Sequence, residues 1–182
     1  AATSMDQGRV AVLHAFGIAS GSMVAPLFPY GVYTVPEIST IGATEEELSS
    51  RGIPYEVGRA RYENNPRGQI VGDLDGFVKL VFDPATRKLL GAHLIGGNAT
   101  ELIHIPQMVM SAGGGLESFL DAVFNFPTLS ECLKYAAFDG LQRLTHRESG
   151  VPLSVVPPQD GPIPPAARAW FLRASRLRKR RR

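Results

Sequence analysis

Alternation of apolar and polar positions predicts the strands of this chain. In the clearest case, Val78, Leu80 and Phe82 lie on one face and Lys79 lies on the other. Alternation and β-branched or aromatic content together predict strands at 32–42, 55–62, 76–82 and 88–95. A short connection at 83–87 joins the last two, so we expect them to form an antiparallel hairpin.

Helical spacing and capping residues predict four helices. The T-x-x-E spacing of a capping box occurs twice, at Thr44–Glu47 and at Thr128–Glu131. Asn98 and Glu101 form a similar pair at the start of another helix. The expected helices are 1–16, 44 to the stop at Gly52, 98 to the glycines at 113–115, and 132–144.

Turn-forming residues separate these elements. Residues 17–31 are rich in Gly, Ser and Pro, and the sequence N-N-P-R-G at 64–68 is typical of a turn. Beyond Thr145 the prolines crowd together and helical periodicity is lost. We therefore expect residues 145–182 to be a proline-rich linker followed by a basic tail, without fixed structure.

Charge is distributed unevenly along the 182 residues, although the net charge is only +2. Residues 168–182 contain 8 of the 19 basic residues and no acidic residue, so residues 1–167 carry a net charge of −6. Such a tail is typical of a solvated segment, and contact with nucleic acid or an acidic membrane surface is an alternative. An accidental extension, such as one from a shifted reading frame, is a third reading of the same residues.

Composition excludes several classes of protein. No apolar run reaches the ~20 residues that a membrane-spanning helix needs, and no segment resembles a signal peptide. Cys132 is the single cysteine, which rules out an internal disulfide and a two-cysteine redox pair within this sequence and favours a reducing, cytoplasmic location. With 44% hydrophobic residues, the chain can bury the core of one domain.

Motifs for metal or nucleotide binding are weak in this sequence. His104 has no second histidine at i+4 and no cysteine nearby, so we expect no metal site there. The glycines at 113–115 lack the lysine and the preceding strand of a phosphate-binding loop. No G-x-G-x-x-G follows a predicted strand, so we expect no dinucleotide bound in the Rossmann manner.

The sequence F-N-F-P-T-L-S-E at 124–131 resembles the H-P-T-x-x-E signature of the pyridine nucleotide–disulfide oxidoreductases, which lies in their C-terminal dimerisation domain. P-E-I-S-T-I-G at 36–42 and the strands at 79–83 and 88–96 resemble the same domain, and the likeness extends over about residues 1–144. The resemblance implies an α+β fold, with a central antiparallel sheet, helices on one side and a two-fold dimer. It implies that 1–17 is the last helix of an otherwise absent FAD domain, 18–144 the dimerisation domain and 145–182 an added tail.

The resemblance also assigns roles to individual residues. Glu131 stands at the signature glutamate, but Phe126 stands at the histidine, and a phenyl ring cannot carry a proton. We therefore expect no catalytic residue in this chain. Ala1 and Ala2 fall on positions whose amides contact the flavin, whereas Phe124, Phe126 and Glu131 fall on the wall that one subunit presents to its partner's flavin.

One branch of the family, the soluble pyridine nucleotide transhydrogenases, has an aromatic residue at the histidine position and lacks the redox disulfide. Likeness to this branch implies FAD, together with NAD and NADP, in a full enzyme that transfers hydride between NADPH and NAD, and implies inactivity of this part alone. The same domain of a dihydrolipoamide dehydrogenase-like reductase, a stand-alone homodimeric interaction module and a non-functional remnant are alternatives. From the residues alone, Glu131 is half of a capping box and Phe126 is a buried or interface aromatic.

Overall fold

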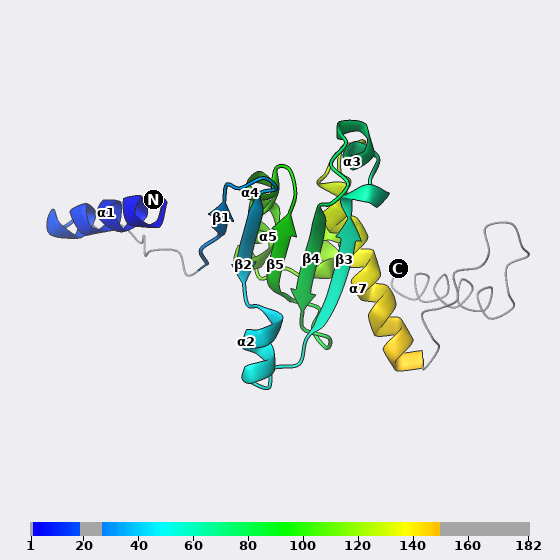
Figure 1. Ribbon diagram of the computed structural model, residues 1–182. Coiled ribbons are helices and arrows are strands. Elements are labelled where there is room, and N and C mark those ends of the chain that lie inside the picture. The colour runs from blue at the N-terminus through cyan, green and yellow to red at the C-terminus, as the bar shows by residue number, and fades with distance from the viewer. Residues whose placement is uncertain (1, 19–26, 150–182) are drawn as a thin grey trace, which may run out of the picture. The chain divides into compact units, whose positions relative to one another are not determined.

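The computed structural model describes residues 2–18 and 27–149 and contains a five-stranded sheet (Figure 1). The strand order is β1-β2-β5-β4-β3, and every neighbouring pair is antiparallel. The strands are β1 (Tyr30–Val32), β2 (Ile38–Gly42), β3 (Glu56–Arg61), β4 (Phe77–Phe82) and β5 (Leu89–Ile95). The helices are α1 (Ala2–Ala15), α2 (Glu45–Ser50), the 3₁₀ helix η1 (Tyr62–Asn64), α3 (Pro66–Val71), α4 (Ala99–Leu102), α5 (His104–Ser111), α6 (Leu116–Leu120) and α7 (Glu131–Ser149).

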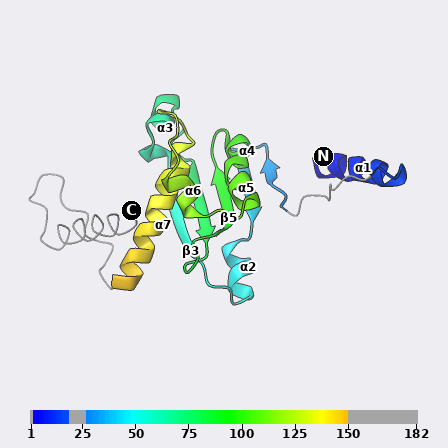
Figure 2. The ribbon, with the colours of Figure 1, turned by 180° about the vertical axis from the view of Figure 1, so that it is seen from behind.

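The main core lies between one face of the sheet and the helices α4 to α7, which Figure 2 shows from the helical side. The alternating residues Val78, Leu80 and Phe82 of β4 are fully buried there, as their spacing predicts. Leu133, from α7, and the other helices supply the opposing side chains. The α+β fold, with an antiparallel sheet and its main helices on one side, is therefore confirmed.

The predicted strand at 32–42 is wrong, because the chain folds back within it. Residues 34–36 form a bend between β1 and β2, in which the Thr34 hydroxyl donates to the Pro36 carbonyl oxygen at 2.8 Å. The two strands then pair antiparallel, with Val32 opposite Ile38. Pro36 has no N–H to give to a ladder, which explains why one continuous strand does not form here.

The predicted turn at 64–68 is also wrong, because a helix begins inside it. Asn65 is the N-cap of α3 and Pro66 is its first residue. Proline suits this position, since its missing N–H would have no partner in the first helical turn and its φ is already helical. Gly72, with φ 75°, ends the helix in the left-handed conformation.

Of the cap pairs, Thr44 and Glu47 form the complete capping box that the sequence predicts. The Asn98 prediction is wrong, because Asn98 has φ 60° and its side chain caps nothing. The amide of Thr100, in the first turn of α4, instead donates to the carboxylate of Glu37 at 3.0 Å. Helix α6 has no counterpart in the sequence prediction.

The ends of the described chain agree with the predicted helices in part. Helix α1 forms where expected, but it buries none of its residues, and Phe16, directly after it, is 77% exposed. Helix α7 continues past Leu144 to Ser149. Most of the loop predicted at 17–31 and nearly all of the tail lie outside the described residues. None of the helices in 2–18 and 27–149 has the length and apolar character needed to cross a bilayer.

Candidate functional site

The loop between α6 and α7 places its two aromatic residues differently. Phe124 is half-buried and packs against the main core. Phe126 is 70% exposed and Val123 is 95% exposed. Phe124 therefore anchors the loop, whereas Phe126 and Val123 present apolar surface outward.

Hydrogen bonds hold the loop just after Phe126, at Thr128. The Thr128 hydroxyl donates to the Asn125 carbonyl oxygen at 2.7 Å, and its amide donates to Glu131 Oε2 at 3.5 Å. The side-chain amide of Asn65 donates to the Thr128 carbonyl oxygen at 3.1 Å. Only the glutamate half of the predicted capping box is present, because the hydroxyl turns back into the loop and does not accept from the N3 amide.

Asn65 is a residue of this site that sequence reasoning missed. It is fully buried, and its Oδ1 accepts from the amides of Arg67 at 2.8 Å and Gly68 at 3.2 Å. The signal that could have found it is an asparagine directly before a proline that opens a helix. Its contact with Thr128 spans 63 positions of the sequence and is visible only in the fold.

Two further sets of hydrogen bonds tie together loops at the same end of the sheet. Gly97 donates its amide to Asp73 Oδ2 at 2.5 Å, and its carbonyl oxygen accepts from the Tyr62 hydroxyl at 3.3 Å. Burial raises the pKa of Tyr62, so its phenol remains a donor. Glu37 accepts from both the hydroxyl, at 2.7 Å, and the amide of Thr100.

The outer face of the sheet carries an apolar row at this end. Val32 pairs with Ile38, Ile38 with Ile95, and Ile95 with Phe77, so the four side chains follow one another across four strands. Val32 is 49% exposed, and Ile38 and Phe77 are each 38% exposed. These exposures leave apolar side-chain surface open along the row.

The rest of the outer face is occupied within the chain. At the far end of the sheet, Leu48 of α2 packs on Val57 and Val81. Between the two ends, Glu45 pairs with Lys79 at 2.7 Å and with Arg59 at 3.5 Å. The accessible apolar surface is thus concentrated at the end of the sheet where α3 and the bend between β1 and β2 lie (Figure 1).

The loop between α6 and α7 presents apolar side chains that can contact another surface. The side chains in and around it are poorly suited to proton transfer or thiol chemistry. Phe126 cannot carry a proton, and the amide of Thr128 occupies one oxygen of Glu131. Cys132 is fully buried, and burial raises the pKa of its thiol to about 12. His104 is exposed, and its Nδ1 lies 2.7 Å from the side-chain oxygen of Gln107.

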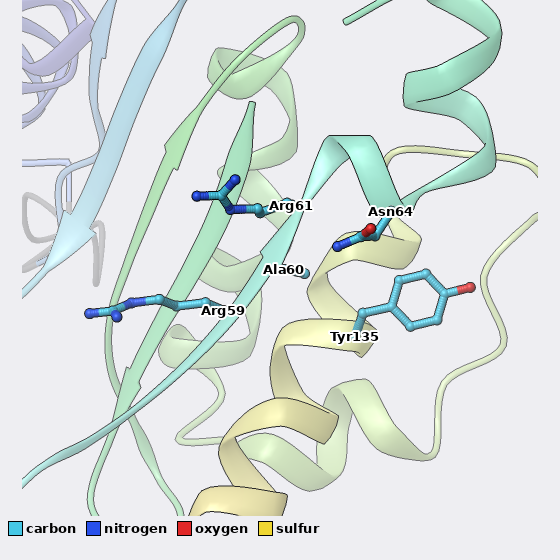
Figure 3. A pocket seen from close by; sticks show the side chains of 5 residues that line it. All are labelled: Arg59, Ala60, Arg61, Asn64 and Tyr135. Atoms are coloured by element: carbon cyan, nitrogen blue, oxygen red, sulfur yellow. The ribbon is translucent and has the colours of Figure 1, made fainter. Parts of the chain in front are cut away.

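A shallow pocket of about 370 Å³ lies at the edge of the sheet, beside α7. It is lined by Arg59, Ala60, Arg61, Asn64 and Tyr135. Figure 3 shows that the two arginine side chains point away from Tyr135, and they pair with Glu45 and Glu63 instead. Because both arginines are engaged with carboxylates, they do not form an anion site in this pocket.

The predicted flavin contacts of Ala1 and Ala2 are not tested by the structure. Ala1 lies outside the described residues, and Ala2 is the exposed first residue of α1. Their role stays a prediction. Phe124 and Phe126 lie in one loop and Glu131 lies at the start of the helix that follows it, and their role as a wall towards a partner's flavin also stays a prediction.

Residues 28–137 match the family model described as the dimerisation domain of pyridine nucleotide-disulphide oxidoreductases. The chain belongs to this family, as its sequence motifs predict. Curated proteins named soluble pyridine nucleotide transhydrogenase are similar to it: one from Mycobacterium bovis (strain BCG / Pasteur 1173P2) is 51% identical over 144 residues, and one from a Marinomonas species is 42% identical over 147 residues. These matches cover 79% of this chain but only 31% and 32% of the relatives, so the chain spans about a third of their length.

Solved structures support the same fold. The HOCl-induced flavoprotein disulfide reductase RclA from Escherichia coli matches with a TM-score of 0.66 and 31% identity, over 71% of this chain and 30% of that protein. LpdA from Mycobacterium tuberculosis matches with a TM-score of 0.66 over 72% of this chain and 29% of that one. Because the second match is only 24% identical in sequence, it supports the fold and nothing further.

Proposed function

We propose that this chain is the dimerisation part of an FAD-dependent oxidoreductase that transfers hydride between NADPH and NAD and that acts as a homodimer. The observation that carries the proposal is Phe126, an exposed phenyl ring at the position where the family signature has histidine. Hydride transfer through a flavin needs no thiol and no proton carrier at that position. The 51% identity with a soluble pyridine nucleotide transhydrogenase supports the same reading.

Bound FAD would supply the hydride acceptor and donor between the two nicotinamides. The described residues form an antiparallel sheet without a Rossmann βαβ unit, so the flavin would be held mainly by regions equivalent to the parts of the relatives that lie outside the match. In that complex Phe126 is an apolar wall that keeps water from the partner's flavin. Phe124 anchors the wall to the core, and Glu131 fixes the backbone of Thr128 beside it.

A disulfide reductase is the main alternative, since the matched structures include flavoprotein disulfide reductases. A reductase of this family uses a proton carrier where Phe126 stands. With phenylalanine there and the thiol of Cys132 fully buried, the site favours the transhydrogenase reading. A stand-alone interaction module remains a separate hypothesis, which the experiment below also tests.

The test is to capture the native protein from its own cells with an antibody against residues 45–62, and to measure its mass and visible spectrum. A polypeptide much larger than 19.7 kDa, with flavin absorption and NADPH-to-NAD transhydrogenation, is the expected result. A colourless species of 19.7 kDa would contradict the catalytic proposal and favour the interaction module. A flavoprotein with a C-x4-C redox pair and reductase activity would favour the alternative enzyme.

The basic tail and the location in the cell are secondary parts of the proposal. Contact of residues 168–182 with a polyanion rests on their charge alone, and these residues lie outside the described part of the chain. Heparin retention that is lost when residues 167–182 are removed would support it. Cytoplasmic location rests on the cysteine content, and fractionation of the native cells would test it.

A further inference from the structure

Asn65 uses the two ends of its side-chain amide for different contacts. The Oδ1 atom caps α3 by accepting from Arg67 and Gly68. The Nδ2 group donates to the carbonyl oxygen of Thr128, in the loop before α7. The side chain is fully buried, so a lost partner here would not be replaced freely by water.

Capping does not explain why the buried residue has an amide group. Asp and Ser cap helices about as well as Asn, because each offers one oxygen to the same amides. Only the Nδ2 donor of Asn65 serves Thr128. The second contact therefore indicates a separate task for this residue, which is to hold the loop.

The contact at Thr128 controls the backbone next to Phe126. Pro127 lies between the two and fixes its own φ, so few backbone rotations separate the bonded carbonyl from the phenyl ring. Phe126 itself is 70% exposed and has little packing of its own. Its position is set by the anchors on either side of it, which are Phe124 in the core and Thr128 on Asn65.

We propose that Asn65 is a positioning residue for the subunit contact, which acts by placing Phe126 against the partner subunit. This inference rests on the proposed function, in which Phe126 faces the partner. It adds α3, an element far from the signature in sequence, to the parts that define the contact. Without the Nδ2 donor, Phe126 samples more positions and loses contact area in the dimer.

The experiment measures subunit exchange between two differently labelled samples of the native-length polypeptide that contains this chain. Asn65→Ser and Asn65→Asp both keep a capping oxygen for α3 and remove the donor to Thr128. We expect each to accelerate exchange by about tenfold, since most changes at an interface appear in the dissociation rate. Asn64→Asp is the matched control: it adds a negative charge at the exposed neighbouring residue and should leave exchange unchanged.

A double-mutant cycle with Phe126→Ala separates positioning from a general loss of stability. Phe126→Ala alone should accelerate exchange, and adding Asn65→Ser to it should then change nothing further. If the two effects multiply, Asn65 does not act through Phe126 and this inference is wrong, although the proposed contact stands. If Phe126→Ala alone leaves exchange unchanged, the proposed contact is wrong and the inference fails with it.

Variants that fold poorly are recognised by thermal unfolding, and hydrogen exchange then gives a second readout on the folded protein. In Asn65→Ser the amides at 124–129 should exchange faster while those at 67–72 stay protected. Equal loss of protection in both segments would show that Asn65 only caps α3, which would overturn the inference. Unchanged protection at 124–129 would overturn it as well.

Discussion

Gly58 on β3 and Gly140 on α7 let this edge strand and this helix touch through their backbones. A Cβ atom on Gly58 would lie 2.0 Å from the carbonyl oxygen of Ala136 and 2.8 Å from the amide nitrogen of Gly140. Next to this contact, the Arg59 amide donates to Asp139 of α7 at 2.9 Å. The same helix begins at the Phe126 loop, so the glycine pair also fixes where that loop starts.

The Gly58→Ala variant should therefore be strongly destabilised. Its methyl group meets backbone rather than a flexible side chain, so strand and helix must separate, which costs about 3 kcal/mol. Urea unfolding of the variant and the wild type measures the difference. Gly8→Ala in α1, where no atom lies within 4 Å of the added Cβ, is the control and should be neutral or slightly stabilising. If the free energy of unfolding of Gly58→Ala lies within about 0.5 kcal/mol of that of the wild type, the close contact between strand and helix is contradicted.

Strands with alternating apolar and polar residues could be predicted from the sequence. The prediction failed at two prolines whose surroundings are compatible with two different local structures. Val78, Leu80 and Phe82 show their buried face directly in their spacing. Pro36 interrupts a β-branched run that otherwise reads as one strand, and Pro66 opens a helix within residues that are also typical of a turn. In both cases the local composition fits two structures, and pairing with distant residues decides between them.

The candidate site was predictable only as far as its family signature extends. Phe124, Phe126 and Glu131 are contiguous in sequence, so one motif was enough to find them. Asn65 reaches Thr128 from another element, and no local pattern indicates a contact between residues so far apart. At Thr128 the hydroxyl half of the capping box is absent, and this too depends on the loop, because the hydroxyl is turned towards the Asn125 carbonyl oxygen, to which it donates.

The two phenylalanines of the loop should respond differently to truncation. Phe124→Ala removes a side chain packed against the core and should lower the free energy of unfolding by about 2 kcal/mol. Phe126→Ala removes a ring that is 70% exposed and should change it by less than about 0.5 kcal/mol. Chemical unfolding under conditions where both variants are monomeric makes the comparison. Equal losses would indicate that Phe126 is held by the chain itself and is not an outward-facing contact.

Cys132 should be inert towards thiol reagents in the folded protein. Its side chain is fully buried, and the raised pKa leaves almost no thiolate at neutral pH. We expect labelling with a disulfide reagent such as dithionitrobenzoate to be at least about a hundredfold slower in the native protein than in denaturant. If other cysteines accompany it in the native polypeptide, Cys132→Ser identifies its share of the signal. Rapid labelling of the native protein at Cys132 would contradict the burial of this helix face.

The bond between Glu37 and Thr100 predicts a loss of stability in acid. The Thr100 hydroxyl, followed by its amide, lowers the pKa of Glu37 below 4.5. A carboxyl group with a lower pKa in the folded state binds protons more readily in the unfolded state, so its contribution is present above pH 4.5 and is lost as the pH falls through the folded-state pKa. Glu37→Gln should be less stable at pH 7 and should lose less stability on acidification. Glu63→Gln, at an exposed carboxylate, is the charge-matched control, and identical acid profiles for wild type and Glu37→Gln would show that the bond to Thr100 contributes nothing.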